Sequence, residues 1–196
     1  MIFHENKCIF MHINKTGGTS IETTLQGFKP HPFHPEKHMD SKSMIELYGK
    51  EKWQKYFTFT FVRNPWDRML SLFLWRKKVK FISKDLKFKN FIMDWDYWRV
   101  YKRIRYENSK RILTSAPQSD WFNGELEFDF VGKFENIQND FDKICEYINF
   151  KKVKLPHRYK TEHDHYSLYY DKDMKNEVER IWGKDIELFK YKFEAS

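Results

Sequence analysis

The stretch that decides the fold is FMHINKTGGTSIETTL, residues 10–25. It overlaps the mostly apolar run KCIFMHI (7–13), which predicts a buried strand, and it ends in TSIETTL, where Ile21 and Leu25 share one helix face. A strand, two glycines and a helix in this order direct backbone N–H groups and the positive end of a helix dipole towards an anion. The stretch therefore predicts a phosphate-binding loop, with an ordinary glycine turn as the alternative.

The order of residues in this loop differs from that of a Walker A loop. Lys15 precedes the two glycines, whereas the motif GxxxxGK[ST] has its lysine after them. The lysine supplies positive charge, the glycines permit positive φ angles and close approach of the backbone to a ligand, and the neighbouring hydroxyl groups supply donors. The candidate phosphate ligands are Lys15, Thr16, Gly17, Gly18, Thr19 and Ser20.

A second junction of strand and helix follows. The run YFTFTFV (56–62) alternates aromatic residues with threonine, which is typical of a strand. Asn64 is a suitable N-cap and Pro65 suits the first helical position, so a helix is expected next. Arg63 ends the strand and Ser71 lies within that helix. A guanidinium group binds phosphate through two hydrogen bonds, and a serine hydroxyl can reach the same group.

The remaining patterns define the fold class. We expect a helix that ends near Gly49, basic aromatic-rich helices over 85–115, a strand within 126–135, an amphipathic helix over 136–148 and a last helix from about Asp173. Strands that alternate with helices predict an α/β fold with a central, mostly parallel sheet flanked by helices.

Composition limits the class of protein. The chain has 196 residues, of which 40% are hydrophobic, 19% aromatic and 33% charged, which predicts one globular domain over residues 1–196. No apolar run is long enough to cross a bilayer and no signal peptide opens the sequence, so we expect a soluble, cytoplasmic protein without a membrane span. The two cysteines, Cys8 and Cys145, lie in apolar contexts and predict buried free thiols.

The positive charge is concentrated in one part of the chain. The net charge is +8, and residues 76–111 contain 13 lysines and arginines against 4 acidic residues. This distribution predicts an anionic partner such as nucleic acid, an acidic glycan or a phosphorylated cofactor. A solvated lysine-rich helix surface is the alternative.

Together the two junctions resemble a known family. KTGGTS after the first strand, followed by strand–RNPxxRxxS–helix, is similar to the sulfotransferases that use 3′-phosphoadenosine-5′-phosphosulfate (PAPS). The likeness is greatest to the carbohydrate branch with the heparan sulfate 2-O and 6-O enzymes and their small bacterial relatives. Residues 38–73, 129–145 and 169–193 also look like family sequence.

The resemblance implies a P-loop-like sulfotransferase fold and in-line transfer of a sulfuryl group from PAPS to an acceptor hydroxyl, with a glycan as the favoured acceptor and PAP as the product nucleotide. In the family the first loop holds the 5′-phosphosulfate, which assigns that role to residues 15–20. In the family the second loop holds the 3′-phosphate of the nucleotide, which assigns that role to Arg63 and Ser71. Lys15 would stabilise the charge that develops as the S–O bond breaks. No Walker B aspartate is evident, so we expect no metal requirement and no metal site.

A base is also implied by the resemblance. It assigns this role to His38, whose imidazole has an ordinary pKa near ~6.5 that suits proton abstraction. His34 and Glu36 are the alternative bases. The spacing of His31, His34 and His38 also suggests zinc, but the intervening prolines and the lack of a fourth ligand disfavour a metal.

Other residues carry weaker expectations. Arg158 and Lys160 match a loop that closes over the nucleotide in the family, with solvated loop charges as the alternative. Gln118 and Trp121 are candidates for contact with the acceptor or the adenine. The other functions considered are an atypical P-loop nucleotide or small-molecule kinase and a basic nucleic-acid-binding module. The glycine–lysine order disfavours the first, and the second leaves both phosphate loops unexplained.

Overall fold

The structure is a computed structural model that describes residues 1–27, 36–96, 116–124, 127–156 and 163–195. The chain divides into two compact units. The first contains the described residues within Met1–Arg63 and Asp120–Tyr159, and the second those within Asn64–Ser109, Leu113–Ser119 and Lys160–Ser196. A single functional domain over residues 1–196 stays a prediction.

The first unit is built on a four-stranded sheet. Its strands are β1 (Ile2–Phe3), β2 (Cys8–Met11), β3 (Phe57–Val62) and β4 (Phe130–Lys133), in the order β1-β2-β3-β4. Strand β1 is antiparallel to β2, whereas β2, β3 and β4 are parallel to one another. The predicted α/β fold with a mostly parallel sheet is therefore confirmed, and the short β1 is an addition that the sequence patterns did not predict.

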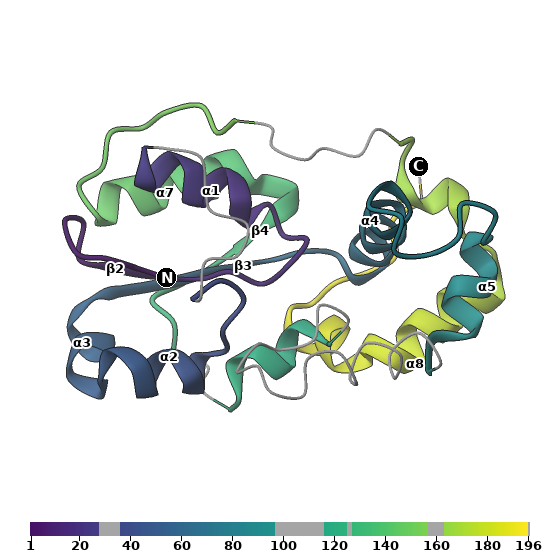
Figure 1. Cartoon of the computed structure of the whole chain (residues 1–196), viewed down its shortest axis with the longest axis horizontal. Coiled ribbons are helices and arrows are strands. Elements are labelled where there is room, and N and C mark those ends of the chain that lie inside the picture. Colours follow the sequence, from purple (N-terminus) through teal and green to yellow (C-terminus); the bar gives the residue numbers. More distant parts are fainter. Residues whose placement is uncertain (28–35, 97–115, 125–126, 157–162, 196) are drawn as a thin grey trace. The chain divides into compact units, whose positions relative to one another are not determined.

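Helices cover both faces of this sheet. Helices α1 (Gly18–Gln26) and α7 (Ile137–Tyr147) lie on one face, and α2 (Ser41–Tyr48) and α3 (Lys50–Lys55) lie on the other (Figure 1). The core between the sheet and the first pair contains the rings of Phe10, Phe59, Phe61 and Phe141, together with both free cysteines. Because both faces are covered, the threonines that alternate with the phenylalanines of β3 are buried as well.

The region around Gly49 differs from the sequence prediction. The helix ends there as expected, since Gly49 has a φ of 87°. However, α3 begins at the next residue. The positive φ of Gly49 turns the chain, and the residues that follow it are again helical. Asp40 caps α2 by accepting a hydrogen bond from the Ser43 N–H at 2.7 Å.

The second unit is helical. Helix α8 (Lys172–Leu188) packs against α4 (Pro65–Lys78) and α5 (Phe88–Met93). Large aromatic side chains fill this unit, and the buried rings of Trp95 and Trp182 meet edge to face at 5.6 Å between centroids. Among the described residues, no helix is long and apolar enough to span a membrane.

Candidate active site

The glycine loop connects β2 to the start of α1. Gly17 has a φ of 80°, in the left-handed region, and α1 begins at Gly18. The N-cap residue, Gly17, has no side chain that could cap this helix, although the Ser20 N–H donates to the Gly17 carbonyl at 3.0 Å. The first N–H groups of an α-helix have no partner inside the helix. The start of α1 therefore offers backbone donors and the positive end of the helix dipole to an anion.

Both glycines are also required by packing. A Cβ atom on Gly17 would come within 2.5 Å of Ile137 Cδ1, and one on Gly18 within 2.2 Å of His12 Cδ2. Neither position can hold a larger residue unless a neighbouring ring or helix moves. The turn is thus fixed between the His12 ring and the start of α7.

Lys15 and Arg63 are held together within the first unit. The Lys15 backbone lies in the left-handed region, with a φ of 66°. Its carbonyl accepts a hydrogen bond from Arg63 Nη1 at 3.2 Å, and the Arg63 guanidinium lies 4.0 Å above the centre of the Phe134 ring. The Thr16 hydroxyl donates to the Ile13 carbonyl at 2.7 Å. The structure therefore brings the strand-end arginine against the glycine loop.

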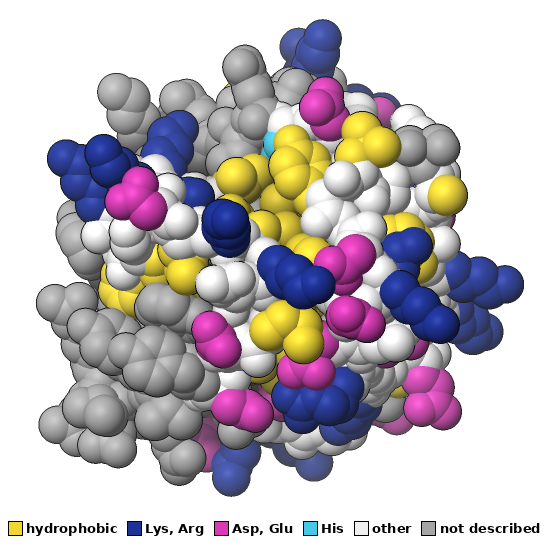
Figure 2. Space-filling view, turned by 90° about the vertical axis from the view of Figure 1, so that its right-hand side faces the viewer, with side chains coloured by type: hydrophobic (Ala, Val, Ile, Leu, Met, Phe, Trp, Pro, Cys, Tyr) yellow, Lys and Arg dark blue, Asp and Glu magenta, His cyan; other side chains and the backbone are white. Residues whose placement is uncertain are grey.

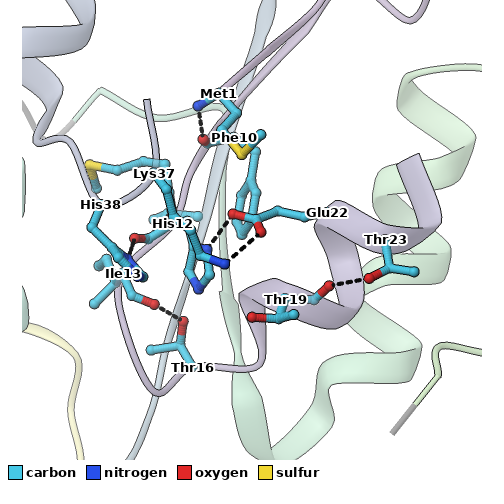
Figure 3. A network of polar contacts seen from close by, with 12 residues as sticks. Met1, Phe10, His12, Ile13, Thr16, Thr19, Glu22, Thr23, Lys37 and His38 are labelled. Atoms are coloured by element: carbon cyan, nitrogen blue, oxygen red, sulfur yellow. Dashed lines mark hydrogen bonds and ion pairs between the residues drawn. The ribbon is translucent and has the colours of Figure 1, made fainter. Parts of the chain in front are cut away.

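His38 lies beside the end of β2. Its Nδ1 is 3.0 Å from the His12 carbonyl oxygen (Figure 3). Because a carbonyl only accepts, Nδ1 carries the proton and Nε2 of the neutral ring holds the free electron pair. Burial and the neighbouring His12 keep the pKa of His38 well below its usual value, although the hydrogen bond to the His12 carbonyl opposes them. The ring is thus in the neutral form that can accept a proton at neutral pH.

A buried charged cluster, which sequence reasoning missed, lies next to His38. It consists of Glu22, His12 and Lys37, and Glu22 is fully buried. Its carboxylate accepts from His12 Nδ1 at 2.5 Å and forms an ion pair with Lys37 Nζ at 3.1 Å (Figure 3). One signal was available in the sequence, because Glu22 shares a helix face with Gly18 and Leu25, where a charged residue is unusual.

The other candidate residues have different surroundings. Glu36 accepts a hydrogen bond from the Tyr48 hydroxyl at 2.6 Å. The Trp121 ring is fully buried and lies edge-on to the His38 ring, 6.1 Å between centroids. Gln118 begins the 3-10 helix η1 (Gln118–Phe122), and its backbone N–H donates to Asp185 in the second unit.

Several predicted site residues stay predictions. Ser71 is buried in α4, which belongs to the second unit. His31, His34, Arg158 and Lys160 lie outside the described residues. Within the described ranges, no group of three or more His, Cys, Asp or Glu side chains could hold a metal ion.

The basic segment is only partly described. Arg76 is buried, and its guanidinium lies 5.2 Å from the centre of the Phe91 ring; burial lowers its pKa to about 10. Lys89 forms ion pairs with Asp171 and Asp173 at 2.9 and 3.9 Å. The face shown in Figure 2 likewise carries acidic side chains interspersed among the lysines and arginines. Lys89 and the face in Figure 2 fit a mixed, solvated surface better than a continuous basic patch, and Arg76 is not part of that surface because it is buried.

Comparison with known proteins identifies the class. The model of the sulfotransferase family matches residues 1–192, so the chain belongs to that family. A sulfotransferase from Alicyclobacillus acidocaldarius has a similar structure, with a TM-score of 0.52 at 13% identity over 95% of this chain and 96% of that one. An uncharacterized protein of Archaeoglobus fulgidus is 28% identical over 108 residues, which are 55% of this chain and 76% of the relative. Family and fold thus support sulfuryl transfer as the general activity.

Proposed function

We propose that this protein transfers a sulfuryl group from PAPS to an acceptor hydroxyl by in-line displacement, without a metal ion. The supporting observation is the grouping around residues 12–15. The glycine loop, the Arg63 guanidinium and the His38 ring all lie beside this short segment, and two of them are hydrogen-bonded to its carbonyl oxygens.

The start of α1 would bind the 5′-phosphosulfate. Backbone N–H groups and a helix dipole suit an anionic group there, and residues 15–20 would supply further donors. Arg63 and Ser71 would bind the 3′-phosphate of the nucleotide, as in the family that the sequence resembles. Arg158 and Lys160 would contribute from the loop that closes over the nucleotide.

The transfer step needs a base and a group that stabilises the leaving phosphate. His38 Nε2 would take the proton of the acceptor hydroxyl as its oxygen forms a bond to sulfur. The bond between sulfur and the bridging oxygen then breaks, and its electron pair stays on the 5′-phosphate of PAP. The Lys15 ammonium would stabilise this developing charge, so it acts mainly in the transition state.

The acceptor is a hydroxyl compound, and we propose a glycan. The experiment is a screen of glycans, phenols and small hydroxyl metabolites with radiolabelled PAPS in buffer that contains EDTA. Transfer of label to at least one glycan is expected. Transfer to phenols alone would overturn the glycan assignment, and transfer of phosphate from ATP in a parallel magnesium-containing reaction would favour the kinase alternative.

A further inference from the structure

We propose that Glu22 is a positioning residue of the active site, whose buried carboxylate holds His12 and Lys37 and through them fixes the ring of His38. This inference rests on the proposed function, in which His38 is the base. It adds three residues to the site, none of which is among the candidate phosphate ligands.

The Glu22 carboxylate is ionised although it is buried. Glu22 is fully buried, and a buried carboxylate is unfavourable unless it is paired and hydrogen-bonded. Burial alone would raise its pKa, but His12 and Lys37 outweigh that effect and lower the pKa to about 2. Glu22 is therefore ionised at neutral pH and attracts both partners. Burial, in contrast, lowers the pKa of His12, so its neutral ring donates Nδ1–H to the carboxylate.

The His12 ring links this carboxylate to the glycine turn. The Cδ2–Nε2 edge of the His12 ring packs so closely on Gly18 that a Cβ there would lie 2.2–2.6 Å from ring atoms. The ring thus occupies the space between the Glu22 carboxylate and the first residue of α1. A hydrogen bond at one edge and close packing at the other fix its orientation.

Lys37 and His12 link the carboxylate to the proposed base, His38. Lys37 precedes His38 directly, and its ammonium is tied to Glu22. The His12 carbonyl accepts the His38 Nδ1 hydrogen bond, and the two rings lie 4.5 Å apart between centroids. His38 also has a φ of 64°, a conformation that a non-glycine residue keeps only when its surroundings hold it there. Glu22 supplies part of that restraint, because it holds both Lys37, the residue before His38, and His12, whose carbonyl accepts the His38 hydrogen bond (Figure 3).

The experiment compares Glu22→Gln with Glu51→Gln, which removes a carboxylate from an exposed ion pair with Lys55. Glutamine keeps an acceptor for His12 but leaves the Lys37 ammonium without its counter-charge. We expect kcat to fall about 10- to 100-fold in Glu22→Gln, because small displacements of a reacting group are costly. The control should keep the wild-type kcat.

The pH profile separates positioning from general loss of structure. The charged or titratable groups that influence His38 are His12, Lys37 and Glu22. The negative charge of Glu22 favours protonated His38, so its removal should shift the acid limb of kcat/KM to lower pH. Lys37→Met removes a positive charge and should shift the limb to higher pH. Wild-type kcat and an unchanged acid limb in Glu22→Gln would overturn the proposal.

Two further measurements cover the remaining outcomes. If Glu22→Gln does not fold, Lys37→Met takes its place, and an unshifted acid limb with wild-type kcat in that variant overturns the proposal. If the wild-type protein transfers no sulfuryl group, the proposed function fails, and nitrogen-detected NMR of the imidazoles still tests the positioning. A single Nδ1–H tautomer of His38 in the wild type that becomes mixed in Glu22→Gln or Lys37→Met supports it, and identical spectra overturn it.

Discussion

The two junctions of strand and helix satisfy their backbone donors in opposite ways. At the start of α1 the N-cap residue, Gly17, has a left-handed φ and no side chain that could accept a hydrogen bond from the helix. At the start of α4 the Asn64 side chain accepts hydrogen bonds from the Trp66 and Asp67 N–H groups at 3.1 and 3.4 Å. Pro65, at the first helical position, has no N–H to satisfy.

This difference indicates how each junction can bind an anion. The β2–α1 junction can present its backbone N–H groups to a ligand, whereas those of the β3–α4 junction are already engaged by the protein. The second junction must therefore act through side chains, as proposed for Arg63 and Ser71. Substitutions at the β2–α1 junction should therefore impair nucleotide binding and sulfuryl transfer. Substitution of the Asn64 cap at the β3–α4 junction should instead lower the stability of the fold.

The largest effect is expected for Gly18→Ala. The new Cβ would collide with the His12 ring and displace the turn, so kcat/KM for PAPS should fall by about 10³-fold or more. Gly183→Ala is the matched control, because a Cβ there meets nothing within 4 Å. Circular dichroism should establish that both variants are folded. Wild-type kinetics in Gly18→Ala would show that the turn tolerates the methyl group.

Lys15→Ala should act mainly on the chemical step. We expect kcat to fall by about 10³-fold, because the ammonium is proposed to stabilise charge on the leaving phosphate. Affinity for PAP, measured by calorimetry, should change much less. Lys55→Ala, at an exposed lysine, serves as the control. A loss of PAP affinity with unchanged kcat would assign Lys15 to ground-state binding instead.

His38→Ala should lower kcat by about 10²-fold or more while PAP affinity is retained. The pKa of His38 is held well below 6.5, so the neutral base predominates at neutral pH and the acid limb of the wild-type rate should lie below pH 6.5. His4→Ala, at a histidine that hydrogen-bonds to the Tyr56 hydroxyl on the surface, should leave the rate unchanged. Full turnover in His38→Ala would remove this residue as the base.

The smallest effect is expected for Asn64→Ala. Loss of the cap should lower the free energy of unfolding by about 1–2 kcal/mol, as measured by urea denaturation. Affinity for PAP per folded molecule should not change, since the side chain acts within the second unit, where it also donates to the Tyr166 hydroxyl and the Lys192 carbonyl. A fall in PAP affinity with unchanged stability would contradict the proposed contrast between the junctions.

Both junctions could be predicted from the sequence because their chemistry is local. A glycine pair after a strand and an Asn-Pro pair before a helix each specify the backbone within a few residues. The structure confirms the helix start at Pro65, and it begins α1 at Gly18, one residue before the predicted helical stretch TSIETTL. The alternation of aromatic residues and threonine likewise identified β3.

The cluster of Glu22, His12 and Lys37 could not be predicted in this way. These residues come from α1, the end of β2 and the segment before α2, and only the folded chain brings them together. Helical periodicity marks Glu22 as a charge on a partly apolar face, but it does not identify the partners. The same limit applies to Arg63, whose hydrogen bond to the Lys15 carbonyl depends on the parallel pairing of β2 with β3.

The most direct test of the central claim is a calorimetric titration of the protein with PAP in the presence of EDTA. If the start of α1 binds the 5′-phosphate, we expect saturable 1:1 binding without metal, which Gly18→Ala weakens strongly and His38→Ala leaves intact. Absence of binding in EDTA, or binding that requires magnesium, would contradict the account.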